Sequence, residues 1–265
     1  MLLRVQTLYE RALTLVSHPR MRGISDRADP VKPVLTAFAK ATADDSVTFV
    51  QIGSNDGTTD DPLRALTEAY GWSGVLVEPV PYVFARLKQE RGSDPRLRFE
   101  NAAIGDHDGE ADFFHLRQRR IGEDRPDWHD QLGSFSLETI LSPEHEEHIP
   151  GIRDLLLRTT VRTLTFESLC RKHDIERFDL LHIDAEGYDW EILRRIELER
   201  YRPSVVLYEH KHLTPEDQRS VETRLEIGGY AWHQAWLDTL AVRRDALVQG
   251  RIMRRAWRQI GGAPL

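Results

Sequence analysis

The stretch Val47–Gly57, with the sequence VTFVQIGSNDG, decides the fold of this chain. Its first half is apolar and rich in β-branched residues, which is typical of a buried parallel strand. Gly53 and Gly57 then mark places where the backbone turns tightly or approaches a ligand closely. A helical pattern begins near Pro62. Strand, glycine turn and helix in this order predict the start of an α/β sheet, with a nucleotide-type site at the carboxyl end of the first strand.

Composition limits the kind of protein. The chain has 265 residues, 40% of them hydrophobic, which is enough for one large domain with a full core. Its formal net charge of -7 argues against a nucleic-acid partner. Cys170 is the only cysteine, which excludes an internal disulfide and fits a reducing cytoplasm; we interpret it as a buried, inert thiol. No apolar run approaches the roughly 20 residues of a membrane helix, so we expect a cytoplasmic protein without a membrane partner.

The two ends of the chain differ from its middle. Residues 1–16 have one apolar face, but charged residues interrupt it, so we interpret them as a packing helix or a dimer contact rather than a signal peptide. A homodimer is therefore an expectation. We divide the chain into a helical appendage (1–43), a main domain (44–245) and a basic tail (246–265), which we expect to be helical and packed on the surface.

Strand and helix patterns alternate through the main domain and end in a hairpin. This order predicts a doubly wound α/β sheet with an antiparallel edge. The glycine turn is not GxGxxG and no P-loop lysine motif is present, which argues against a dinucleotide enzyme and a kinase. The expected strands lie at 47–52, 74–78, 97–100, 159–163, 178–183 and 203–208, followed by the hairpin at 230–243.

An adenosine site is predicted beside the glycine turn. Glu78 ends the second strand, some twenty residues after the turn, where an acid can accept both ribose hydroxyls. The alternative is a solvated loop carboxylate. Asn101 and Ala102 follow the third strand, where they would flank an adenine ring.

Residues 117–150 are polar and weakly periodic, and we interpret this insertion as a substrate-side cover. His145 and His148 within it suggest a metal site, but their spacing does not match HExxH. We favour a solvated helix start, with Ser142 as N-cap and Pro143 at the first position.

Two later strands end in candidate metal ligands. Asp184 and Glu186 follow the strand at 178–183, and Glu209 and His210 follow the next strand. Because the carboxyl ends of parallel strands meet at one edge, Asp184, Glu209 and His210 could converge on Mg²⁺ or Mn²⁺. The alternative is a base and carboxylate pair without metal. An adenosine site combined with these acids points to S-adenosylmethionine.

At this point the sequence resembles the FkbM-type methyltransferases of the class I S-adenosylmethionine-dependent superfamily. The resemblance covers about Val47 to Arg243 and rests on VQIGSNDG, VLVEPVP, NAAIGD, LLHIDAEGYDWEIL and VVLYEH. The stretch IDAEGYDWEIL is the most specific of these. The resemblance implies a seven-stranded, Rossmann-like fold and O-methylation of a natural product or a sugar hydroxyl.

The resemblance also assigns roles to residues. It gives the first turn to the methionine part of the cofactor, Glu78 to the ribose, and Asn101 and Ala102 to the adenine. More distant metal-dependent sugar and catechol O-methyltransferases place an ion where this chain has Asp184, Glu209 and His210. The full set of expected cofactor residues is Gly53, Ser54, Asn55, Asp56, Glu78, Asn101, Ala102 and Asp184.

Catalysis is expected at Asp184, Glu186 and His210. A bound cation would stabilise the acceptor alkoxide, and Glu186 or His210 would remove its proton. His182, inside its strand, is expected to be packed or to lie beside the adenine. A metal-independent His/Glu base, a nitrogen or carboxyl acceptor, and a non-catalytic S-adenosylmethionine-binding partner protein are the alternatives. Four tryptophans could stack on a sugar acceptor: Trp128, Trp190, Trp232 and Trp236.

Overall fold

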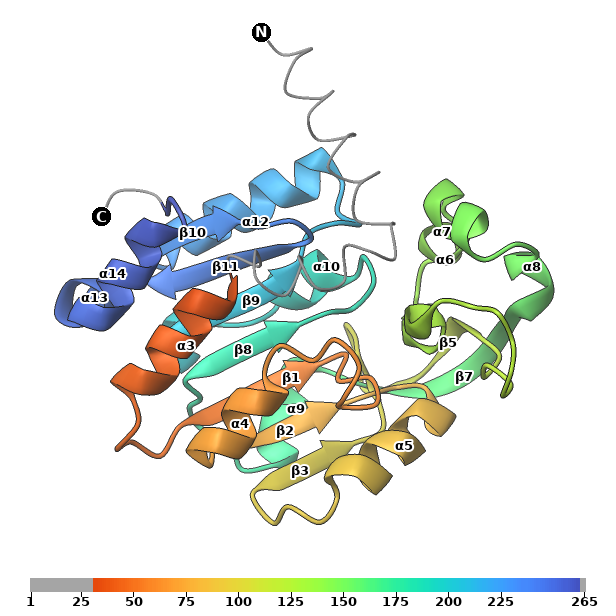
Figure 1. Ribbon diagram of the computed structural model, residues 1–265, viewed down its shortest axis with the longest axis horizontal. Coiled ribbons are helices and arrows are strands. Elements are labelled where there is room, and N and C mark those ends of the chain that lie inside the picture. The colour runs from red at the N-terminus through yellow and green to blue at the C-terminus, as the bar shows by residue number, and fades with distance from the viewer. Residues whose placement is uncertain (1–30, 263–265) are drawn as a thin grey trace, which may run out of the picture.

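A computed structural model describes residues 31–262. The helix expected at 1–16 lies outside this range. A central sheet carries helices on both faces, and a second, smaller sheet extends from one side of it (Figure 1). No helix within the described range has the length and apolar character that a membrane crossing requires.

The central sheet has seven strands in the order β10-β11-β9-β8-β1-β2-β3. The strands from β9 to β3 are parallel, while β11 is antiparallel to β9 and to β10. This arrangement confirms the predicted doubly wound, Rossmann-like sheet with an antiparallel closing hairpin. The strands are β1 (Thr48–Ile52), β2 (Ser73–Val77), β3 (Leu97–Glu100), β8 (Leu180–Ile183), β9 (Val205–Glu209), β10 (Tyr230–Gln234) and β11 (Asp238–Arg243).

The register aligns the carboxyl ends of the parallel strands. Ile52 of β1 lies opposite Val77 of β2 and Ile183 of β8. Ile183 in turn lies opposite Tyr208 of β9. The residues that follow these strands therefore meet at one edge of the sheet.

Helices begin where local capping chemistry predicts. The hydroxyl of Thr165 accepts a hydrogen bond from the Ser168 amide, and Thr214 caps the helix that Pro215 opens. The helices around the central sheet are α3 (Val31–Ala41), α4 (Arg64–Tyr70), α5 (Pro81–Arg91), α9 (Phe166–Lys172), α10 (Asp189–Leu193), α11 (Leu198–Tyr201), α12 (Pro215–Ile227), α13 (Arg244–Gln249) and α14 (Arg251–Gln259).

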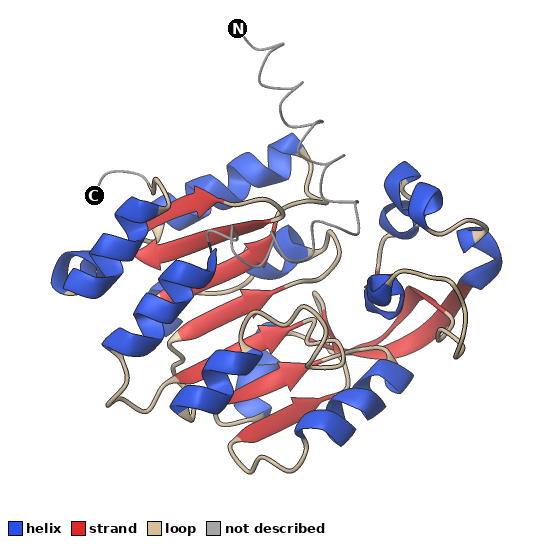
Figure 2. Ribbon diagram, in the orientation of Figure 1, coloured by secondary structure: helices blue, strands red, loops and turns tan. Residues whose placement is uncertain are grey.

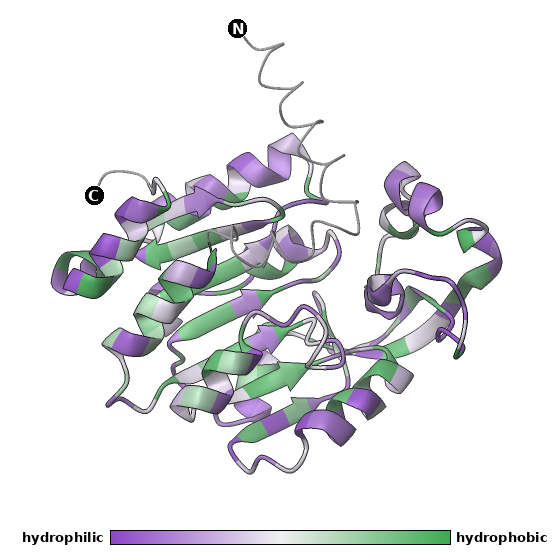
Figure 3. Ribbon diagram, viewed as in Figure 1, coloured by the Kyte–Doolittle hydropathy of each residue, from purple (hydrophilic) through white to green (hydrophobic). Residues whose placement is uncertain are grey.

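Two apolar layers hold these helices to the sheet. The strands of the central sheet are mostly apolar, whereas the surrounding helices contain many polar residues (Figure 3). One layer joins α3, α4, α13 and α14 to the sheet, and the other joins α9 to α12. Trp257 of α14 is only 1% exposed, so the tail contributes to the core rather than resting on the surface.

The second sheet has the order β4-β7-β5-β6, and the insertion predicted as a substrate-side cover lies between its strands β5 and β7 in the sequence. Residues 117–155 connect its two long strands, and we call them the cover module. Contrary to their weak periodicity, they contain short helices around a small apolar core (Figure 2). The elements are β4 (Ala103–Ile104), β5 (Gly109–Leu116), η2 (Asp127–Gln131), β6 (Gly133–Ser134), α6 (Leu137–Ile140), α7 (Pro143–His148), α8 (Ile152–Leu155) and β7 (Leu156–Leu164).

Candidate functional site

A cavity lies at the carboxyl ends of β1, β2 and β8. The turn after β1 forms one wall, and the loop after β8 forms another. Of the expected cofactor residues, the cavity is lined by Gly53, Ser54, Asn55, Glu78, Ala102 and Asp184.

The turn after β1 is pinned between two neighbouring strands. The amides of Gly53 and Ser54 both donate to the carbonyl of Val77, at 3.0 and 2.9 Å. On the other side, the Asp184 amide donates to the Ile52 carbonyl at 2.9 Å. Gly53 has a φ of 77°, which favours glycine. The backbone conformation of this turn is therefore fixed by its neighbours.

Asp56 and Asn101 shape loops and do not line the cavity. One carboxylate oxygen of Asp56 accepts hydrogen bonds from the amides of Thr58 and Thr59, at 2.9 and 2.8 Å. Burial raises the pKa of Asp56, but these hydrogen bonds outweigh it and the net pKa is lowered. The Asn101 amide nitrogen donates to the carbonyls of Glu78 and Pro79, at 2.8 and 3.0 Å. Both residues thus stabilise the loops that follow β1 and β2.

Glu78 is buried at the end of β2. Its carboxylate accepts hydrogen bonds from the amides of Asn55, at 3.1 Å, and Val80, at 2.8 Å. Burial raises its pKa to about 7, against the lowering effect of these two bonds. A carboxylate offers about four acceptor positions, so two remain for hydroxyl donors.

His182 is buried in β8 and lines the same cavity, beside Gln51 of β1. Burial lowers the pKa of His182 to about 4, so the ring is neutral at pH 7. Gln51 donates to Asp61 at 3.1 Å. Neither Gln51 nor Asp61 was expected at the site, because a glutamine inside a strand and an acid in a loop carry no motif.

Three carboxylates converge at this edge of the sheet, and Asp184 and Glu186 among them line the cavity. Ligand oxygens of Asp184, Glu186 and Glu209 all lie within 4.8 Å of one another. Burial, followed by repulsion from Glu186, raises the pKa of both Asp184 and Glu209 well above the ordinary values. One oxygen of Glu209 is buried without a hydrogen-bond partner. Such a group is costly without a cation or protons to neutralise it.

His210 does not join this group, which corrects the expected ligand set and the expected base. Its ring is buried, with Nδ1 3.0 Å from the hydroxyl of Thr239. Successive side chains of an extended segment point to opposite sides, so Glu209 and His210 cannot both face the same point. Glu186 takes the third position beside Asp184 and Glu209 instead.

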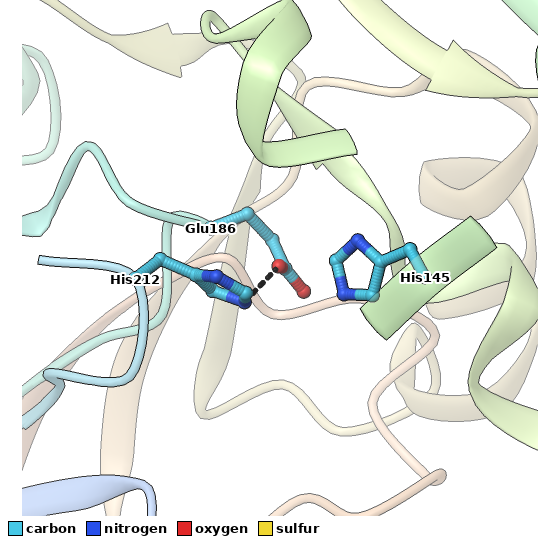
Figure 4. A group of neighbouring side chains, drawn as sticks. All are labelled: His145, Glu186 and His212. Atoms are coloured by element: carbon cyan, nitrogen blue, oxygen red, sulfur yellow. Dashed lines mark ion pairs between the residues drawn. The ribbon is translucent and has the colours of Figure 1, made fainter. Parts of the chain in front are cut away.

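Two other histidines reach the cluster. His212 Nε2 lies 3.3 Å from Glu186 Oε2 and 3.9 Å from Glu209 Oε2. His145 points toward the same carboxylate from α7 (Figure 4). The Ser142 cap and Pro143 are where the sequence places them, but His145 is only 2% exposed, so the helix start is not solvated. The role of His212 was missed, although it stands two residues after His210.

Glu186 is held in an unfavourable backbone conformation. Its φ is 48°, in the left-handed region that a glutamate rarely adopts. The Ser134 hydroxyl, from the cover module, donates to the Glu186 carbonyl at 2.7 Å. Strain of this kind persists where the surroundings fix it, and it concentrates at functional sites.

Comparison with protein families identifies the chain. The family model of the methyltransferase FkbM domain matches residues 51–244. This chain belongs to the FkbM methyltransferase family. S-Adenosylmethionine is the cofactor expected for this family. The predicted family membership is thereby confirmed.

Solved structures of other methyltransferases have a similar fold. FkbM from Methylobacillus flagellatus KT is 13% identical, with a TM-score of 0.46, covering 74% of this chain and 43% of that one. The METTL16 methyltransferase domain is 11% identical, with a TM-score of 0.39, covering 76% of this chain and 59% of that one. A putative caffeoyl-CoA O-methyltransferase from Staphylococcus aureus is 8% identical, with a TM-score of 0.41, covering 90% of this chain and 99% of that one. The chain thus spans less than two thirds of the first two proteins. A comparison with curated proteins found no match.

Proposed function

We propose that this FkbM-family protein is an S-adenosylmethionine-dependent O-methyltransferase acting on a hydroxyl of a sugar, saccharide or natural product. The observation that carries the proposal is the position of the three carboxylates. Asp184 and Glu186 line the cavity that the glycine turn and Glu78 also line. Groups able to activate a hydroxyl therefore stand beside the expected cofactor site.

The cavity suits an adenosine bearing an amino-acid chain. Glu78 has free acceptor positions for the ribose hydroxyls, Ala102 leaves room for a flat base, and the turn at Gly53–Asn55 faces the methionine part. When bound, the cofactor supplies a methyl group that is already activated by the sulfonium. The protein has to supply an acceptor oxygen that is nucleophilic and correctly aimed.

Glu186 and His212 are suited to remove the acceptor proton. Burial raises the pKa of Glu186, but its contact with His212 outweighs this and the net pKa is lowered, so the group is ionised at pH 7. A carboxylate paired to an imidazole can take up a proton and pass it on. General base catalysis of this kind contributes typically ~10²–10⁴ in rate. The pair replaces His210 as our candidate base.

A divalent cation fits the carboxylate group. Asp184, Glu186 and Glu209 would hold it, and their oxygen atoms match the preference of Mg²⁺ and Mn²⁺. A cation would neutralise the buried Glu209 oxygen that has no hydrogen-bond partner. It would also favour the ionised forms of Asp184 and Glu209, whose pKa values are raised without it. A cation there would stabilise the acceptor alkoxide. The Glu186–His212 contact equally supports the alternative, a methyltransferase that uses this base without metal.

Titration calorimetry and a turnover assay test the proposal. EDTA-treated protein is titrated with S-adenosylmethionine and then with Mg²⁺, and S-adenosylhomocysteine release is measured with sugars and polyketides as acceptors. We expect cofactor binding in the wild type and in Glu209→Gln, whose side chain does not line the cavity, with the Mg²⁺ response lost and turnover reduced only in the variant. Asp44→Asn, at an exposed site before β1, is the matched control.

The outcomes separate the alternatives. Cofactor binding and turnover without a Mg²⁺ response would favour the metal-independent base. Cofactor binding without turnover on any hydroxyl would favour a nitrogen or carboxyl acceptor, or a non-catalytic binding protein. Absence of cofactor binding would contradict the whole proposal.

A further inference from the structure

We propose that His145, Glu186 and His212 form a second metal site, which binds a transition-metal ion such as Zn²⁺, Co²⁺ or Fe²⁺ and fastens the cover module to the central sheet. The three side chains offer two imidazoles and one carboxylate from three separate elements (Figure 4). Imidazole ligands suit Zn, Fe, Ni and Cu rather than Mg²⁺. The site shares Glu186 with the carboxylate group of the proposed methyl transfer and differs from it in its two imidazole ligands. While an ion occupies this site, the Glu186–His212 pair is not available as the base.

The donor atoms are already close to the spacing of a coordination sphere. One ligand atom of each residue lies within 4.8 Å of the other two, and His212 Nε2 is 3.3 Å from Glu186 Oε2. Zinc binds nitrogen at about 2.0–2.1 Å, which separates two tetrahedral ligands by about 3.3 Å. The His212–Glu186 pair has this spacing, and the ligand atom of His145 lies within 4.8 Å of both partners.

The orientation of His145 is that of a metal ligand. Its Nδ1 lies 3.0 Å from the Thr139 carbonyl and 3.3 Å from the Ile140 carbonyl. Because a carbonyl oxygen only accepts, Nδ1 carries the hydrogen and Nε2 keeps its free electron pair. A hydrogen bond from the second ring nitrogen to a backbone carbonyl is the usual support of a ligating histidine.

The three elements belong to different parts of the fold. His145 comes from α7 of the cover module, whereas Glu186 and His212 come from the loops after β8 and β9 (Figure 1). Two polar contacts of the module lie close to these loops: the Ser134–Glu186 hydrogen bond and an ion pair of Lys211 with Glu144 at 3.2 Å. An ion at the new site would link His145 of the module to Glu186 and His212 on the other side of this junction. Metal binding would therefore order the substrate side of the cavity.

Cobalt titration with variants tests the site. EDTA-treated protein without cofactor is titrated with Co²⁺, whose visible absorption reports nitrogen ligation, and Zn²⁺ is added to compete. We expect binding in the wild type and a loss of affinity of at least tenfold in His145→Ala and His212→Ala. His148→Ala is the matched control, because His148 lies on the same helix but outside the cluster. Asp184→Asn distinguishes the two proposed metal sites, because Asp184 belongs only to the carboxylate group; this variant should keep the Co²⁺ spectrum.

Thermal unfolding provides the second readout. Zn²⁺ should raise the melting temperature of the wild type and of His148→Ala, but not that of His145→Ala. No Co²⁺ spectrum in folded protein, equal loss in His148→Ala, or complete loss in Asp184→Asn would overturn the inference. S-Adenosylmethionine binding is measured on the same samples. Cofactor binding without a Co²⁺ signal would contradict only this metal site. A Co²⁺ signal without cofactor binding would contradict only the proposed function.

Discussion

A Cβ atom placed on Gly53 would lie 1.7 Å from the carbonyl oxygen of Asp184. The turn after β1 and the end of β8 therefore touch through their backbones. The contact joins the predicted cofactor turn to the first residue of the carboxylate group. Any side chain at position 53 has to push these two segments apart.

Gly53→Ala should accordingly destabilise the protein and abolish cofactor binding. Left-handed backbone alone costs a non-glycine residue roughly 1–3 kcal/mol, and the clash adds to it. Gly122→Ala is the control, since Gly122 has a φ of 84° with nothing within 4 Å of its Cβ position. We expect a clearly larger loss in the free energy of unfolding for Gly53→Ala, measured with urea. Equal losses in the two variants would show that the backbone contact is unimportant.

Cofactor affinity should depend on the ionisation of Glu78. Burial raises its pKa in the folded protein from the ordinary 4.5 to about 7, so below about pH 7 the carboxyl is protonated and accepts ribose hydroxyls poorly. We expect S-adenosylmethionine affinity in calorimetry to fall as the pH is lowered from 8 to 6 in the wild type. Glu78→Gln should bind weakly at every pH. A wild-type affinity that does not change over this range would contradict the assigned role.

Glu78 should also make the free energy of unfolding depend on pH, in the direction opposite to that of cofactor affinity. Because the pKa of Glu78 is raised in the folded protein, the folded state binds this proton more tightly than the unfolded state does. The stabilisation that the proton gives is complete below pH 4.5 and is lost as the pH rises through about 7. The shift corresponds to at most about 3 kcal/mol. Without cofactor, the free energy of unfolding of the wild type should therefore fall relative to that of Glu78→Gln between pH 5 and 8. Parallel curves would argue that Glu78 is not buried as described.

Glu209→Gln should stabilise the metal-free protein while reducing turnover. The substitution removes one of three crowded carboxylates. Burial, followed by repulsion from Glu186 and Asp184, raises the pKa of Glu209. We expect a gain of about 1–2 kcal/mol at pH 7 in EDTA, because function-related strain is relieved. Thermal unfolding and the S-adenosylhomocysteine assay measure the two effects. Excess Mg²⁺ should narrow the stability difference, since it stabilises only the wild type.

The C-terminal helix should be essential for stability. Trp257 of α14 is buried in the layer that also contains Phe38 of α3 and Leu240 of β11. Its replacement by alanine leaves a cavity and should cost about 3–5 kcal/mol. Trp236, which is 43% exposed, is the control and should change stability little on replacement. Urea unfolding of both variants gives the comparison.

Much of the fold follows from local chemistry. The parallel strands are short apolar runs, and hydroxyl caps with a following proline mark the starts of α7 and α12. Glycine at position 53 and the acid at position 78 are likewise visible in the sequence, because a turn and a strand end impose their residue types locally. These features were predictable without knowledge of the tertiary contacts.

The membership of the carboxylate and histidine groups was not predictable in the same way. The sequence indicates that Asp184 and Glu209 end neighbouring strands, but it does not give the direction in which His212 points after the strand has ended. Nor can helix capping show that His145 is buried, because its partners Glu186 and His212 are far away in the chain and meet it only when the cover module packs on the sheet. The sequence by itself thus determined the sheet, the glycine turn and the family. Tertiary packing decided which imidazoles face the acids, since side-chain direction in loops depends on long-range contacts rather than on local periodicity.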